Sequence, residues 1–120
     1  QSMTSSVLGD GGIYTSLVEY AKWDAALHTE KLVPAAMLEK AFTSGRLADG
    51  SETGYGFGWR IEKKNGLKVV HHTGSTTGFN NFVRRIPARR MCVAVFANRN
   101  GEEPKALAPE IEDLVLGAME

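Results

Sequence analysis

Apolar and polar positions alternate most clearly in the second half of the chain. Aromatic and aliphatic side chains alternate with glycine or arginine over 55–61, which predicts a strand over 55–63 with one aromatic and one nearly bare face. Asn65-Gly66 predicts a two-residue hairpin turn, because both central residues of a type I′ turn need a positive φ. We therefore expect this strand to pair antiparallel with a strand over 67–72.

A second hairpin is predicted after the first. Residues 79–86 and 91–98 form two apolar segments around a short turn at 87–90. The second of these segments has no polar alternation, which is typical of a strand covered on both faces. The hydroxyl- and glycine-rich stretch that starts at His72 is predicted to be a turn between the hairpins, where backbone N–H groups can approach a ligand closely.

Helical periodicity precedes and follows these strands. Ser16 and Glu19 have capping-box spacing, which predicts a helix from Ser16 to about His28. A second helix is expected to begin at Pro34, where a missing N–H is harmless. The first helix is assigned an apolar face of Leu17, Val18, Ala21 and Ala25, widened by Tyr20, Trp23 and Leu27. The last helix is expected to lie across the sheet through Leu107, Ile111, Leu114, Val115 and Ala118.

The pattern as a whole predicts an α+β fold. We expect an antiparallel sheet of about four strands, with a helix on one face and a helical pair on the other. The chain divides into a loop over 1–12, a helical segment over 13–54, antiparallel strands over 55–98 and a C-terminal helix over 104–119. Pro109 is expected in the first turn of that last helix, where it costs no hydrogen bond.

Composition and charge are those of an ordinary globular domain. Of 120 residues, 42% are hydrophobic and 23% charged, which is enough for a buried core. Lys plus Arg and Asp plus Glu number 14 each, so no net field favours nucleic acid or an anionic membrane. The pairs Arg84-Arg85 and Arg89-Arg90 are predicted to be solvated strand ends. Cys92 is the single cysteine and is predicted to be a small buried hydrophobe.

Several short segments follow one another in a fixed order. They are Gly-Asp-Gly-Gly-Ile-Tyr-Thr-Ser from Gly9, Lys-Trp-Asp from Lys22, Tyr-Gly-Phe-Gly-Trp from Tyr55, His-Thr-Gly-Ser-Thr-Thr-Gly-Phe from His72, and Ala-Asn-Arg-Asn from Ala97. In order and spacing they resemble the C-terminal part of the serine β-lactamase and penicillin-binding-protein family. Class C β-lactamases and D-alanyl-D-alanine peptidases are the most similar members, and the resemblance covers roughly residues 9–118.

The resemblance implies acyl-serine chemistry, for which the chain lacks the nucleophile. In this family a serine attacks a carbonyl, while a lysine one helical turn later and a tyrosine from another loop handle protons. No serine here has a lysine three residues on, and no tyrosine has an asparagine two residues on. The Gly-x-Ser-x-Gly elbow of another serine-hydrolase class is also absent. We therefore expect the C-terminal part of a longer enzyme, unable to catalyse acyl transfer by itself.

The resemblance also implies a substrate-binding wall. His72, Thr73 and Gly74 stand in place of the family's Lys-Thr-Gly motif, with Thr73 expected to bind the substrate carboxylate and Gly74 to keep the strand edge open. The backbone N–H of Ser75 is expected to be the second oxyanion-hole donor, typically worth about 3 kcal/mol of barrier. No cofactor is implied. His71 is predicted to face the other side of the strand as a packed or surface residue, which argues against zinc.

Two departures from the family pattern leave alternatives open. A histidine in the lysine position makes carboxylate attraction pH-sensitive, because an unperturbed histidine titrates near ~6.5. Glu103 and Ala106 stand where class C enzymes carry Asn and Arg. The expected substrate is a β-lactam, a D-alanyl peptide or a small ester. An esterase of the same fold and a non-catalytic binding or sensor module are the alternatives.

The remaining expectations concern partners and compartment. The N-terminal part of the parent enzyme is the first expected partner, and self-association through an exposed sheet edge is the second. The residues leave the compartment open, and the resemblance implies a periplasmic or secreted protein.

Overall fold

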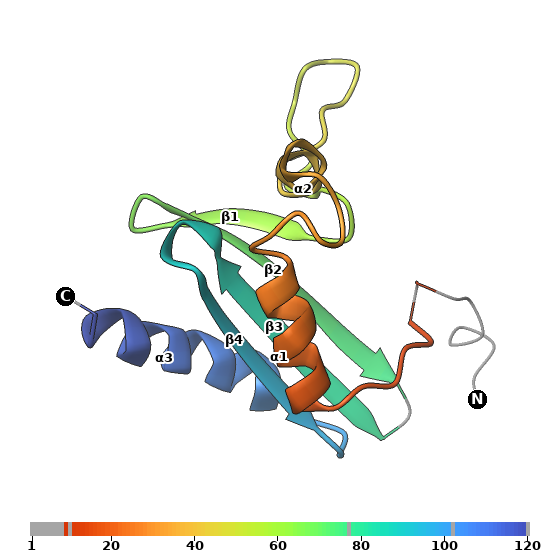
Figure 1. Cartoon of the computed structure of the whole chain (residues 1–120), viewed down its shortest axis with the longest axis vertical. Coiled ribbons are helices and arrows are strands. Elements are labelled where there is room, and N and C mark those ends of the chain that lie inside the picture. Colours follow the sequence, from red (N-terminus) through yellow and green to blue (C-terminus); the bar gives the residue numbers. More distant parts are fainter. Residues whose placement is uncertain (1–8, 10, 77, 102, 120) are drawn as a thin grey trace.

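The computed structural model describes residues 9, 11–76, 78–101 and 103–119. These residues form three α-helices around one antiparallel sheet with the strand order β1-β2-β3-β4 (Figure 1). The α+β class and the four-stranded sheet predicted from the sequence are confirmed. The elements are α1 (Leu17–Ala26), α2 (Ala35–Ala41), β1 (Arg60–Lys64), β2 (Leu67–Thr76), β3 (Phe79–Ile86), a 3-10 turn (Pro87–Arg89), β4 (Met91–Ala97) and α3 (Glu103–Gly117).

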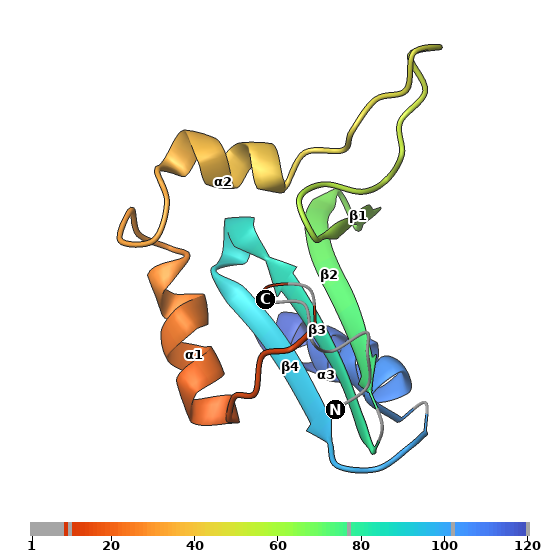
Figure 2. The ribbon, with the colours of Figure 1, turned by 90° about the vertical axis from the view of Figure 1, so that its right-hand side faces the viewer.

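The sheet lies between two helices. α3 packs on β3 and β4 from one side, and α1 contacts β4 from the other (Figure 2). α2 and the loop after it lie toward one end of the sheet (Figure 2). The prediction that β4 is covered on both faces is therefore confirmed. The core on the α3 face consists of Val69, Phe82, Ile86, Met91, Val93 and Ala108.

The cap of α1 follows the prediction, whereas its inward face follows it only in part. Ser16 Oγ accepts a hydrogen bond from the Glu19 N–H at 3.2 Å. Leu17 and Val18, which were predicted to be buried, are exposed. Tyr20, which was predicted to widen the apolar face, does turn toward the sheet, where the centre of its ring lies 5.6 Å from that of Phe96 in an edge-on contact. The helix also turns Asp24 inward, toward Arg85 of β3.

Arg84 and Arg85 are buried, which contradicts their prediction as solvated strand ends. The side chain of Arg84 is 6% exposed and that of Arg85 is 1% exposed. Arg85 Nε donates to Asp24 of α1 at 2.5 Å, and Arg84 Nε donates to Glu112 of α3 at 2.8 Å. Buried charges need partners, so each helix faces the sheet with a carboxylate as well as with apolar side chains.

The need to pair the buried Arg84 with Glu112 also rotates α3 away from its predicted orientation. Its buried residues are Pro104, Ala108 and Glu112, spaced four apart along the stripe that brings Glu112 to Arg84. The predicted stripe is exposed at Leu107, Ile111, Leu114 and Val115. Pro109 lies in the helix interior, beyond the first turn.

β1 is shorter than predicted. Residues 55–59 form a loop, because Gly54 and Gly58 adopt φ values of +68° and +76°, in the left-handed region that only glycine enters easily. The Gly56 N–H donates to the Trp59 carbonyl at 2.8 Å and closes a turn. The alternation over 55–61 resembles a strand pattern, but the glycines in it serve to fold the chain back.

Gly56 fixes this loop against α2, and replacing it by alanine is expected to destabilise the fold. A Cβ at Gly56 would stand 2.1 Å from the Ala41 carbonyl oxygen, which is backbone and cannot swing aside. We expect Gly56→Ala to lower the free energy of unfolding by about 1–3 kcal/mol. Urea denaturation would measure the loss. Gly11→Ala is the control, since nothing lies within 4 Å of a Cβ there; equal midpoints for the two variants would contradict this packing.

β2 is longer than predicted. The stretch from His72, predicted to be a turn, continues as a strand to Thr76 and pairs with β3 from Val70↔Arg85 to Thr76↔Phe79. The chain reverses only between Thr76 and Phe79, where Thr77 lies outside the described residues. Hydroxyl-bearing β-branched residues fit a pleated strand as well as a turn, and pairing with β3 decides between the two. Among the described residues, no helix has both the length and the apolar character needed to cross a membrane.

Candidate functional site

The four predicted site residues lie in sequence along β2, with side chains on alternate faces. Val69 belongs to the core under α3, so the odd-numbered residues of β2 face α3. Thr73 and Ser75 therefore present their side chains on the α3 face, and His72 and Gly74 face the side of α1. The predicted residues are together in space, but they occupy both faces of one strand instead of lining one turn.

The backbone direction of these residues follows from the first hairpin. Asn65 and Gly66 have φ values of +50° and +76°, as a two-residue turn requires, and Lys64↔Leu67 is its closing pair. In such a hairpin the closing residues exchange both hydrogen bonds, and the alternate residues along the strand point the same way. The backbone groups of the odd-numbered residues of β2 therefore point toward β1.

β1 ends before it reaches the site. Its last pair with β2 is Arg60↔His71, so no strand among the described residues pairs with Thr73 or Ser75 on that side. The backbone N–H and C=O groups of Thr73 and Ser75 therefore point to an open strand edge. An extended ligand can hydrogen-bond to such an edge as an added strand does.

His72 is held by two hydrogen-bond partners. Its Nδ1 lies 2.6 Å from the Thr73 carbonyl oxygen, and its Nε2 lies 2.8 Å from the hydroxyl of Tyr55. A carbonyl only accepts, so in the neutral imidazole Nδ1 carries the hydrogen and Nε2 accepts from the tyrosine O–H. The two rings meet edge-on with centroids 5.9 Å apart. Tyr55 is thus a site residue that the alternation pattern assigned to the face of a strand.

The loop before β1 positions Tyr55 through its backbone. The Tyr55 carbonyl accepts from the Gly45 N–H at 2.9 Å, and the Tyr55 N–H donates to Thr53 Oγ1 at 3.2 Å. The guanidinium of Arg60 lies 6.0 Å from the centre of the tyrosine ring, on the strand that follows the loop. The hydroxyl of Tyr55 is therefore carried to His72 by a segment that is itself tied to the residues after α2.

Gly74 makes room for the side chain of Asn81. The two residues are paired across β2 and β3, and a Cβ at Gly74 would stand 2.7 Å from both amide atoms of Asn81. The space beside Gly74 on the His72 face is therefore occupied by an amide group. Asn81 is a second polar residue of this region for which the sequence offered no indication, since only the pairing register brings it to Gly74.

His71 faces away from this site. Its ring packs edge-on against Phe82 with centroids 5.4 Å apart, and its Nε2 lies 3.5 Å from a carboxylate oxygen of Glu62. Burial lowers the pKa of His71 from the ordinary value for histidine. The neighbouring histidines therefore lie on opposite faces, as predicted. No group of three or more His, Cys, Asp or Glu side chains among the described residues has the arrangement of a metal site.

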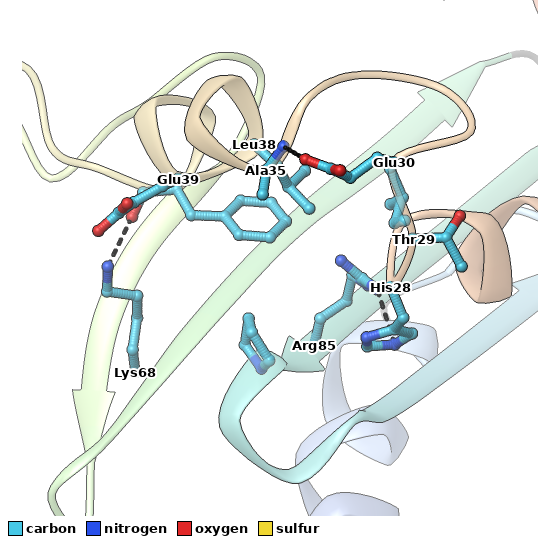
Figure 3. A pocket seen from close by; sticks show the side chains of 11 residues that line it. His28, Thr29, Glu30, Ala35, Leu38, Glu39, Lys68 and Arg85 are labelled. Carbon is cyan, nitrogen blue, oxygen red and sulfur yellow. Dashed lines mark hydrogen bonds between the residues drawn. The ribbon is translucent and has the colours of Figure 1, made fainter.

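A cavity of about 360 Å³ lies elsewhere, between the end of α1, α2 and the sheet. Figure 3 shows Lys68 and Arg85 reaching it from β2 and β3. Lys68 Nζ donates to the Phe42 carbonyl at 3.1 Å. Arg85 pairs with Asp24, and its Nη2 lies 3.2 Å from Nε2 of His28. Protein partners thus engage these cations, and none of the predicted site residues lines this cavity.

Cys92 is not a nucleophile in this structure. Its thiol is partly buried on the α1 face of β4, and burial raises its pKa to about 12. The thiolate is therefore scarce at neutral pH, in line with the prediction of a small buried hydrophobe.

Comparison with known proteins supplies the family. The sequence model described as Beta-lactamase matches residues 1–116. The chain belongs to the β-lactamase family. It is 26% identical over 114 residues to "Penicillin-binding protein 4*" of Bacillus subtilis (strain 168), covering 92% of this chain and 25% of that protein.

A solved structure of the family shares the fold. The octameric penicillin-binding protein homologue from Pyrococcus abyssi superposes with a TM-score of 0.78 at 30% sequence identity, over 92% of this chain and 26% of that one. The chain thus spans about a quarter of the length of each of these relatives. Its sheet and helices are those of the serine β-lactamase and penicillin-binding-protein fold, as the ordered segments predicted.

Proposed function

We propose that this chain forms the substrate-binding wall of an acyl-serine hydrolase of the β-lactamase family, and that the nucleophile lies elsewhere in a longer parent protein. The observation that supports this most directly is the open edge of β2, to which Thr73 and Ser75 direct their backbone groups. A β-lactam, a D-alanyl peptide or a related ester would lie along that edge.

The roles of the site residues follow from their positions. The Ser75 N–H points out of the edge and would donate to the oxyanion that develops when a serine attacks the substrate carbonyl. The hydroxyl of Thr73 would bind the substrate carboxylate from one face of the edge, and the positive charge of a protonated His72 would attract it from the other. Gly74, between them, lets the Asn81 amide pack beside the strand.

Two observations support a longer parent. Among the described residues, more large apolar side chains are exposed than buried, with Val18, Phe57 and Leu114 each more than half exposed. Small soluble domains rarely leave so much apolar surface uncovered. The sequence also lacks the Ser-x-x-Lys and Tyr-x-Asn motifs that acyl-serine chemistry in this family uses.

One observation favours an esterase of the same fold as the second candidate. The lysine of the family motif, a permanent cation, is replaced by His72, and in its neutral form both ring nitrogens are engaged within the protein. A site whose imidazole is neutral suits an ester without a carboxylate better than it suits a penicillin.

Covalent labelling tests the proposed function. The chain and its parent would each be incubated with a fluorescent penicillin and analysed by intact mass. We expect an adduct on the parent only, because the nucleophile is outside this chain. An adduct on the chain itself would overturn the assignment of the chemistry to the rest of the parent. No adduct on either protein would contradict penicillin acylation and favour the esterase or a non-catalytic binding module.

A further inference from the structure

We propose that the hydroxyl of Tyr55, switched by protonation of His72, is the donor that selects carboxylate-bearing substrates at the edge of β2. The inference rests on the proposed function, because it concerns substrate choice at the same site. It assigns a specificity role to a residue outside the His-Thr-Gly triplet.

In the neutral site, the Tyr55 hydrogen is already in use. The Nδ1–H of His72 donates to the Thr73 carbonyl, which leaves the lone pair of Nε2 facing the tyrosine oxygen at 2.8 Å. A tyrosine hydroxyl has one hydrogen, and here it is donated to Nε2. When His72 is neutral, neither His72 nor Tyr55 therefore has a free hydrogen to donate to a substrate carboxylate. The Tyr55 oxygen would face the carboxylate with lone pairs only.

Protonation of His72 reverses this hydrogen bond. A proton taken from solvent at Nε2 turns that nitrogen into a donor, while Nδ1–H keeps its bond to Thr73. The tyrosine oxygen then accepts from Nε2–H, and its own hydrogen is free to rotate outward. Only the bond from Nε2 to the added proton forms, and the hydroxyl merely turns.

The protonated pair is suited to a carboxylate for two reasons. The released O–H can donate to a carboxylate oxygen, and the imidazolium behind it supplies a positive charge at close range. Tyr55 is 37% exposed, so a ligand at the strand edge can reach its ring and hydroxyl. The carboxylate would then contact the tyrosine hydroxyl, with the histidine acting through it.

The charged and titratable groups around His72 come from β1, β3, α1 and β2 itself. Arg60 lies by the Tyr55 ring on β1 and stays cationic at every working pH. Across the sheet, Val83 pairs with His72 and carries no charge, and Asn81 is neutral. Farther along the same face, Arg85 is paired with Asp24 of α1. His71 points to the other face beside Glu62.

The test compares two substrates in the parent protein. One is a β-lactam with its free carboxylate, and the other is the methyl ester of the same β-lactam. We expect the preference in kcat/KM for the carboxylate form to rise as pH falls and His72 takes up a proton. At low pH, Tyr55→Phe should lose at least about tenfold of this preference, as expected for a hydrogen bond to a charged group, so its loss on the carboxylate form should exceed its loss on the ester.

Tyr14→Phe is the matched control, since Tyr14 is exposed and makes no contact with His72. It should retain the wild-type preference at each pH. A parent that turns over substrate but shows an equal loss on both substrates for Tyr55→Phe, or a preference independent of pH, would overturn the inference and leave the proposed function standing.

A measurement without turnover separates the two ideas when the parent hydrolyses neither substrate. Nitrogen-15 NMR of histidine-labelled parent, with His72 assigned by His72→Gln, reports which ring nitrogen carries the hydrogen. When the imidazole is neutral, the inference requires that Nδ1 carries the hydrogen and that Nε2 carries none and accepts a hydrogen bond. The Nε2 resonance should then move in Tyr55→Phe. Hydrogen on Nε2, or an Nε2 resonance unaffected by Tyr55→Phe, would refute it.

Discussion

Replacing Glu112 by alanine is expected to lower the free energy of unfolding by about 3–5 kcal/mol. The Glu112 side chain is 1% exposed and accepts hydrogen bonds from Arg84 Nε at 2.8 Å and from Lys64 Nζ at 3.2 Å. Arg84 is itself buried, so removing the carboxylate leaves a guanidinium in the core of the α3 interface with only Glu62 as its partner. Breaking a buried, hydrogen-bonded ion pair costs far more than an exposed pair contributes.

Urea denaturation would measure this loss against a matched control. Glu110→Ala changes an exposed glutamate on the same helix to the same residue, so helix propensity changes equally and the free energy should move by no more than about 0.5 kcal/mol. Equal midpoints for the two variants would show that Arg84 does not depend on Glu112.

A double variant isolates the role of the charge. Arg84→Met with Glu112→Leu removes both partners and keeps apolar volume in the interface. Replacing a whole buried pair is often neutral, whereas breaking it is costly. We therefore expect the double variant to be more stable than Glu112→Ala alone. A double variant less stable than the single one would mean that the pair contributes net stability beyond mutual neutralisation.

These buried pairs explain why the strands were easier to predict than the orientation of the helices. The Asn65-Gly66 turn and the uninterrupted apolar run of β4 are local features, and each fixes its strand without knowledge of the rest. The faces of α1 and α3 are set by Asp24 and Glu112, whose arginine partners are 61 and 28 residues away in sequence. A periodicity argument places charges in water, so it assigned the apolar stripe of α3 and the Leu17 and Val18 side of α1 to the core, although both are exposed.

In the candidate site, too, local features could be predicted from the sequence, whereas contacts between distant residues could not. The His-Thr-Gly triplet and the residue after it are contiguous in sequence, so the motif locates them directly. Tyr55 reaches His72 only because glycines with positive φ fold the preceding loop, and a strand pattern and this loop share the same alternation. The continuation of β2 through the triplet depends on pairing with β3, which no local pattern encodes.

Replacing His72 by alanine in the parent protein is expected to impair capture of a carboxylate-bearing substrate. A protonated imidazole is positively charged and a neutral one is not, so carboxylate attraction by His72 is present at low pH and lost at high pH. A hydrogen bond to a charged group is worth about 1.5–3 kcal/mol, so kcat/KM at low pH should fall by about 10- to 100-fold. At high pH, where the wild-type imidazole carries no charge, the loss caused by His72→Ala should be much smaller than at low pH.

The kinetics across pH decide whether the charge of His72 is responsible. His71→Gln is the control, because His71 lies on the other face of β2 and its loss should leave the profile unchanged. His72→Lys carries a positive charge throughout the working range, so it should restore capture and remove the pH dependence. Wild-type kinetics at every pH in His72→Ala would exclude the imidazole from substrate binding. A flat loss across pH would instead assign it a steric role beside the edge of β2.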